Sequence, residues 1–254
     1  MKPHARQRGA ALLTLLLIAT AAMAAVLLSA FGGSSVERAR EERTYAMLAQ
    51  ANEALIGFAA THGRLPRPAT PAIAAGTGTR SSIDAGSAGA GMGADAGTGT
   101  GEVGRERSAP CASEADCTGL LPWMDLGLPA QDNWGHQLRY SVTPAFTVAP
   151  LARTALIASK RVLSRDASGT LFFVAGQEAC SLAAQCAPAV ILSRGRSDTP
   201  DSQDEAGNLL ATTNFMQRPR SAEANAPGGA FDDLLTVVPL NTLYERMAAA
   251  KTLP

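Results

Sequence analysis

Four carboxylates lie close together in the segment 198–208, DTPDSQDEAGN. They are Asp198, Asp201, Asp204 and Glu205, and clustered oxygen ligands of this kind are what Ca²⁺ prefers in proteins. Their spacing does not match the EF-hand pattern, however. We therefore expect a solvated acidic loop and no cofactor, with a calcium site at these four residues as the alternative.

The cysteines form two close pairs, Cys111 with Cys117 and Cys180 with Cys186, each with five residues between its members. This spacing is wider than the two-residue spacing typical of zinc sites. In an oxidising compartment we expect local disulfides that each close a short loop. Four cysteines allow three pairings, so the sequence leaves the connectivity open.

The usual sequence signatures of catalysis are missing. Neither Gly-x-Ser-x-Gly nor His-Glu-x-x-His occurs, and the nearest acidic residue to His136 is Asp132 in a predicted turn. Lys and Arg total 22 and Asp and Glu total 22, which leaves no basic excess for binding nucleic acid. We expect no catalytic residues, no enzymatic activity and no nucleic-acid partner.

An uncharged segment, residues 10–31, comes before all of these groups. As a helix it is roughly 33 Å long, which matches a hydrocarbon core of roughly 30 Å. Lys2, Arg6 and Arg8 precede it, and the positive-inside rule then places residues 1–9 in the cytoplasm and the rest across the membrane. The sequence therefore predicts a single-pass membrane protein.

The rest of the chain predicts an α+β domain packed on the exported half of a long N-terminal helix. Gly32-Gly33 loosens that helix, and an amphipathic continuation over 34–62 ends at Gly63 and Pro66. Residues 71–107 form a flexible insertion rich in Gly, Ala, Ser and Thr, because such a stretch cannot repay its ordering entropy.

Residues 108–254 are expected to form the exported domain, built on a small antiparallel sheet. The candidate strands are 137–142, 155–159, 171–175, 189–193 and 234–238. Asn241 then caps a short final helix that places Leu243 and Met247 on one face.

Several blocks of the chain resemble bacterial prepilin-type proteins, the type IV pilins and the pseudopilins of type II secretion. The leader resemblance lies in Gln7-Arg8-Gly9, set directly against the apolar run. The other matching blocks are spread along most of the chain: 55–59, 61–66, 119–123, 126–128, 132–135, 138–140, 231–235, Pro239, 241–243 and Met247.

This resemblance implies a pilin-like subunit cleaved between Gly9 and Ala10 by a prepilin peptidase, which also methylates the new N-terminus. The apolar helix, with Thr14, Leu15 and Ile18, is then an assembly element that packs against other pilin or pseudopilin subunits. The family usually has Glu at the fifth mature position, where this chain has Thr14, and that departure is compatible with a minor or tip subunit.

Further implications concern location and the proposed sites. The resemblance places the N-terminus on the cytoplasmic side of a bacterial inner membrane and the C-terminal domain in the periplasm or on an extracellular filament. Some pseudopilins bind calcium in a loop comparable to 198–208. Relatives commonly carry Cys where this chain has Arg67, which makes Cys111 a substitute partner for Cys117.

Two other functions stay open. The first is a signal-anchored or secreted periplasmic binding protein, because Ala22-Met23-Ala24 fits a signal-peptidase site. The second is an exported hydrolase whose site is assembled only by the fold. The N-terminus of the mature protein distinguishes the first from a pilin, and any turnover would identify the second.

Overall fold

The computed structural model of the chain describes residues 7–69 and 103–253. These residues belong to two compact units, Met1–Arg43 and Thr44–Pro254. Most of the predicted leader, residues 1–9, and most of the predicted insertion, residues 71–107, lie outside the described part. The domain boundaries expected from the sequence therefore stay predictions.

The first element, α1, runs from Gln7 to His62 and contains 56 residues. Gly32 and Gly33 lie inside it, and α1 includes residues 34–62, the expected continuation of the helix. Gly63 ends α1 with a left-handed φ of 69°, and its amide donates to the Ala59 carbonyl oxygen at 2.9 Å. Residues with a side chain disfavour that conformation, so a glycine is well suited to end the helix there. The predicted end of the helix at Gly63 is confirmed.

The described part of the chain provides no membrane-spanning helix. Crossing a bilayer takes about 20 consecutive apolar residues in one helix, and none of the described helices meets that requirement of length and apolar character. The prediction of a transmembrane segment at residues 10–31 is therefore wrong. The expected single-pass placement in an inner membrane, with a cytoplasmic N-terminus and a periplasmic domain, is corrected with it.

The second unit is an α+β domain whose main sheet has four antiparallel strands in the order β1-β2-β5-β7. The strands are β1 (Thr118–Leu120), β2 (Arg139–Val142), β5 (Ala189–Ser193) and β7 (Leu234–Val237). Every residue of β5 is buried, as expected for a central strand covered on both faces.

A second sheet has three strands in the order β4-β3-β6. They are β3 (Arg161–Arg165), β4 (Leu171–Ala175) and β6 (Asn214–Met216). The β3–β4 pair is antiparallel, whereas β3 and β6 run parallel. The expectation of a single small antiparallel sheet is therefore corrected to one antiparallel sheet and one mixed sheet.

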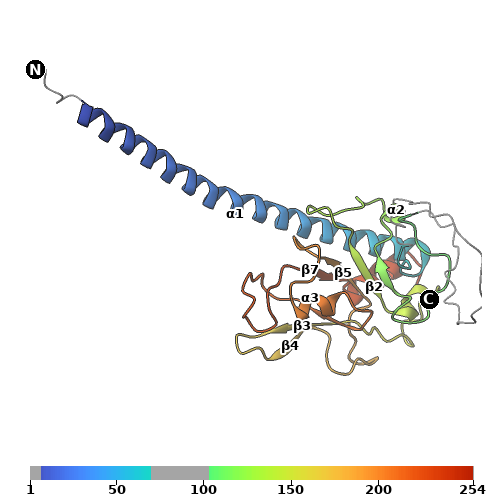
Figure 1. The fold of residues 1–254 in the computed structure, drawn as a ribbon. Coiled ribbons are helices and arrows are strands. Elements are labelled where there is room, and N and C mark those ends of the chain that lie inside the picture. Colours follow the sequence, from blue (N-terminus) through green and yellow to red (C-terminus); the bar gives the residue numbers. More distant parts are fainter. Residues whose placement is uncertain (1–6, 70–102, 254) are drawn as a thin grey trace, which may run out of the picture. The chain divides into compact units, whose positions relative to one another are not determined.

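Within the second unit, the last turns of α1 pack against the four-stranded sheet, as Figure 1 shows beside β2, β5 and β7. Leu48, Leu55 and Ala59 follow helical spacing and join one buried cluster with Tyr140 and Ile191. The side-chain amide of Asn52 donates to the Val237 carbonyl oxygen at 3.1 Å, which fixes α1 against β7.

Short helices connect and close the domain. They are α2 (Trp123–Leu126), the 3₁₀ helix η1 (Pro144–Thr147), α3 (Gln203–Asn208) and α4 (Leu240–Ala249). Leu243 and Met247 of α4 are both buried, which confirms their predicted common face. Asn241 is not the N-cap of α4: the cap position is Pro239, and no side chain caps the helix.

Candidate functional site

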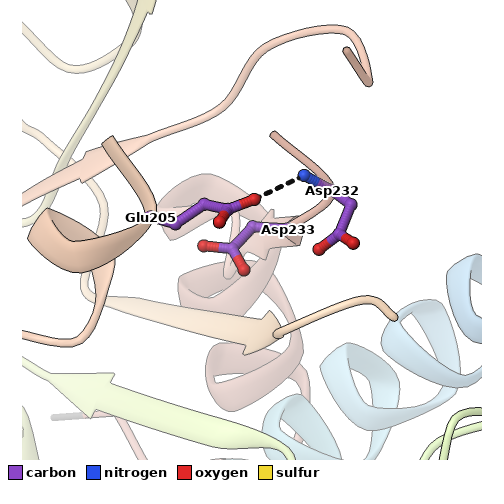
Figure 2. Close-up of side chains that lie close together, drawn as sticks. All are labelled: Glu205, Asp232 and Asp233. Atoms are coloured by element: carbon purple, nitrogen blue, oxygen red, sulfur yellow. Dashed lines mark hydrogen bonds between the residues drawn. The ribbon is translucent and has the colours of Figure 1, made fainter. Parts of the chain in front are cut away.

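Three carboxylates from two distant segments of the chain lie close together. Glu205 lies in the first turn of α3, where Ser202 caps the helix by accepting a hydrogen bond from the Glu205 amide. Asp232 and Asp233 directly precede β7. Glu205, Asp232 and Asp233 each offer one oxygen within 4.8 Å of the others, and Figure 2 shows the three side chains close together. We call these three residues the acidic cluster.

Hydrogen bonds hold each member of the acidic cluster in place. The Glu205 carboxylate accepts from the Asp232 amide at 2.6 Å, the bond dashed in Figure 2, and from the Asp201 amide at 2.7 Å. The Asp233 carboxylate accepts from the side-chain amide of Asn208 at 2.8 Å. Glu205 thereby ties the loop before α3 to the start of β7, so it has a structural role whatever else it binds.

Burial and crowding change how these carboxyls titrate. Burial raises the pKa of Asp233 to about 7, and the neighbouring charges of Glu205 and Asp232 act in the same direction. Burial also raises the pKa of Glu205. One oxygen of Asp232, Oδ1, is buried and has no hydrogen-bond partner in the described part of the chain. The acidic cluster therefore favours uptake of a proton, or of a cation that replaces it.

The four residues predicted as calcium ligands have different surroundings. The Asp198 side chain is 89% exposed and lies 2.7 Å from His136 Nε2. Asp201 accepts from the Ser197 hydroxyl at 2.8 Å. Asp204 is only 3% exposed and forms ion pairs with two arginines, Arg165 at 2.9 Å and Arg218 at 3.0 Å.

Glu205 is thus the one predicted ligand that belongs to the acidic cluster. Asp232 and Asp233, its two companions, were not among the predicted ligands, although both belong to the block 231–235 quoted for the prepilin resemblance. Calcium, the alternative to a solvated acidic loop without a cofactor, stays untested, and the acidic cluster shares only Glu205 with the four ligands expected for it.

The two cysteine pairs form local disulfides, Cys111–Cys117 and Cys180–Cys186. Cys111 and Cys117 are buried in the same hydrophobic cluster as the last turns of α1. The first disulfide therefore connects the loop before β1 to the core, while the second closes the loop between β4 and β5.

His136, the histidine considered as a catalytic base, lies in a buried hydrogen-bond network. Its Nδ1 is 3.0 Å from the Gly195 carbonyl oxygen, and its amide donates to Asp132 Oδ1 at 2.9 Å. Ser193 donates directly to Asp132 Oδ2 at 2.6 Å. These contacts fix the turn 132–136 against the end of β5. The expectation that the chain is not an enzyme stays a prediction.

The residues predicted for processing and assembly all lie in α1. Gly9, Ala10 and Thr14 belong to its first turns, together with Leu15 and Ile18. The Ile18 side chain is 70% exposed and that of Leu16 is 60% exposed, so the smaller unit presents apolar surface there.

This chain matches no protein-family model, no curated protein and no solved structure.

Proposed function

We propose that the chain is a pilin-like structural subunit, a minor pilin or pseudopilin, of a type IV pilus or a type II secretion system. It acts by assembly, and the partners are other pilin or pseudopilin subunits and the prepilin peptidase that matures them. The proposal rests on the matching blocks described above and on α1. One part of this helix is buried in the core of the second unit, and another part exposes apolar side chains.

The division of α1 is the observation that carries the proposal. From Thr44 onward its apolar residues belong to the core of the second unit, where Leu48, Leu55 and Ala59 are buried. In the first unit the same helix exposes Leu16 and Ile18. Because exposed apolar surface costs roughly 25 cal/mol per Å², large side chains of this kind favour a protein partner.

A helix of a neighbouring subunit suits this surface best. Residues 10–31 carry no charge, so two such segments bring no like charges together when they pack side by side. Small residues such as Ala21 and Ala22 also allow close approach of two helices. This packing needs no membrane span, because each apolar segment is covered by the next subunit.

Processing prepares the segment for assembly. Cleavage between Gly9 and Ala10 removes Lys2, Arg6 and Arg8, the basic residues that precede the apolar run. Removing these charges lowers the repulsion between helices that pack with their N-termini at similar heights. Thr14 adds no buried charge at the position where the family usually has Glu.

Site-specific photo-cross-linking in the native host tests the assembly role. A photoreactive residue at Ile18 is expected to give adducts whose cross-linked peptides come from the N-terminal apolar helix of another pilin-like subunit. Val36 is the matched control, because it is also exposed on α1 but lies outside the apolar run. Equal adducts from both positions, or adducts from Ile18 to unrelated proteins alone, would contradict the proposal.

A further inference from the structure

The strand β4 is an uncovered edge of the three-stranded sheet. Within the described residues it pairs with β3 alone, and Figure 1 shows the β3–β4 hairpin at the periphery of the second unit. Its residues Leu171, Phe172, Phe173 and Val174 are between 39% and 51% exposed. Because successive side chains of a strand point to opposite faces, both faces of β4 expose large apolar groups. An exposed apolar edge of this kind is a template for pairing with another strand.

The other three sheet edges in the described part of the chain have contacts that cover them. The amide of Ala69 donates to β1 at 2.8 Å, and the side chain of Asn52 donates to β7. The side chain of Asn208 bonds both backbone groups of Met216 in β6, donating to the carbonyl oxygen at 2.9 Å and accepting from the amide at 2.6 Å. The chain thus covers these edges with its own residues, whereas β4 keeps an edge that a second strand can reach.

The direction of the backbone groups in β4 follows from the hydrogen bonds of β3. Leu163 of β3 accepts from the Gln217 amide, just after β6, at 2.8 Å, so its backbone groups point away from β4. Its partner in the antiparallel β3–β4 pair is Phe173. Two opposite residues of such a pair either bond each other or both point away. The amide and carbonyl groups of Phe173 therefore point to the outer edge, as do those of Leu171 two residues earlier.

A second copy of β4 fits this edge in one register. In an antiparallel pair with a two-fold axis at Phe172, Leu171 of each copy lies opposite Phe173 of the other. Both residues have outward-pointing backbone groups, so each of these pairs can exchange both of its N–H···O=C bonds. The two Phe172 side chains meet on the axis, in a pair without backbone bonds, where side chains are closest. Residues 170–176 carry no charge, so no like charges meet along the paired stretch.

The size of this contact indicates a weak dimer. A phenylalanine side chain buries roughly 200 Å² when it is fully covered, and the two of β4 are 49% and 39% exposed. They therefore contribute about 200 Å² in each copy, to which Leu171 and Val174 add less. The total for two copies stays below the roughly 1,200 Å² at which stable interfaces begin. Such a dimer forms at high local concentration and dissociates on dilution.

We propose that the second unit dimerises reversibly by antiparallel pairing of β4 with β4 of a second copy. Pairing covers the apolar side chains of both edges and provides partners for their outward-pointing backbone groups. A two-fold contact of this kind is closed, so it produces dimers and not filaments. The interface goes beyond the pilin-like role, because all of its residues belong to the second unit and none belongs to the apolar part of α1.

Cysteine cross-linking of the purified full chain tests this dimer. The four native cysteines all form disulfides, so Phe172→Cys introduces a single free thiol. Across the two-fold axis the Cα atoms at position 172 should lie about 4.5 Å apart, a separation that a disulfide can bridge. Mild oxidation is expected to give a covalent dimer on a non-reducing gel, with the cross-link between the two copies of position 172.

Val174→Cys is the matched control for register. Val174 is as exposed as Phe172, but its two copies are offset by about four residues, or about 14 Å along the strands. This separation is too large for a disulfide, so the variant should stay largely monomeric.

A second pair of variants tests whether the edge itself carries the dimer. Adding Leu171→Lys to Phe172→Cys should lower the yield of cross-linked dimer several-fold, because a lysine on an edge strand opposes strand pairing. Adding Leu182→Lys is the control, since Leu182 is an equally exposed apolar residue outside β4. The yield should then stay unchanged.

Three results would overturn the proposal, and none of them bears on the processing of α1. The first is that Phe172→Cys gives no more dimer than Val174→Cys. The second is that Leu182→Lys lowers the yield as much as Leu171→Lys. The third is that a photoreactive residue at position 172 in the native host cross-links other proteins and never a second copy.

Discussion

Replacing Asp233 by Asn should change how the stability of the second unit depends on pH. The pKa of Asp233 is raised from 3.8 to about 7, chiefly by burial. The folded protein thus holds this proton more tightly than the unfolded chain. The resulting stabilisation is fully present below about pH 4 and is lost as the pH rises through about 7.

The size of the effect follows from this difference in pKa. A shift of about 3 pH units, at about 1.4 kcal/mol per unit, gives at most about 4 kcal/mol between pH 4 and pH 8. Asn stays neutral at every pH, and its side-chain oxygen can still accept from Asn208. The variant should therefore match the original chain at pH 4 and be the more stable of the two at pH 8.

Urea unfolding followed by the fluorescence of Trp123 and Trp134 measures this at pH 4, 5, 6, 7 and 8. Glu245→Gln is the matched control, because it neutralises an exposed carboxyl on α4, away from the acidic cluster. Parallel pH profiles for Asp233→Asn and the original chain would refute the reasoning. So would an equal change of profile in the control.

Three further predictions concern buried charges and calcium. Asp204→Asn should lower the free energy of unfolding in urea by about 3 kcal/mol, because it leaves Arg218 and Arg165 without their buried carboxylate partner. A change below about 0.5 kcal/mol would contradict this. Glu114→Gln should cost about 2 kcal/mol, since Lys160 is fully buried beside it and burial already lowers the pKa of Lys160; an unchanged urea midpoint would refute the role of this pair. Calcium added at pH 7.5 tests the alternative of a calcium site: binding at the acidic cluster should raise Tm, and Asp233→Asn should abolish the rise. An unchanged Tm for the original chain would contradict the calcium alternative.

Strands with a strong apolar pattern could be predicted from the sequence. The segments 171–175 and 189–193 form β4 and β5 with the expected bounds, and β7 ends one residue early. The segment 155–159 is equally apolar but is not a strand. Gln185 bonds its backbone groups at Leu156 and Ala158 in place of a neighbouring strand, and no sequence pattern reveals such a contact.

Other parts of the fold have a weaker signal. In β3 the buried positions are Val162 and Ser164. Because one of the two buried residues is polar, the sequence lacks the alternation of apolar and polar residues that is typical of a strand. The acidic cluster combines Glu205 with residues 27 and 28 positions further along. Because only tertiary packing brings them together, the sequence could propose Glu205 as a ligand but not its companions.

The N-terminal segment shows a different limit. Its length and lack of charge predicted a membrane span, a reading that treats residues 10–31 as a separate element. In the structure they are part of α1, a helix of 56 residues. The composition of one segment thus did not determine the role of the whole helix.

The N-terminal sequence and mass of the mature protein from its native host test the central proposal most directly. The pilin-like role predicts a chain that begins at an N-methylated Ala10, and a Gly9→Arg variant that stays uncleaved and fails to assemble. A start near Ala25, or an intact Met1, would contradict processing by a prepilin peptidase and with it the proposed function.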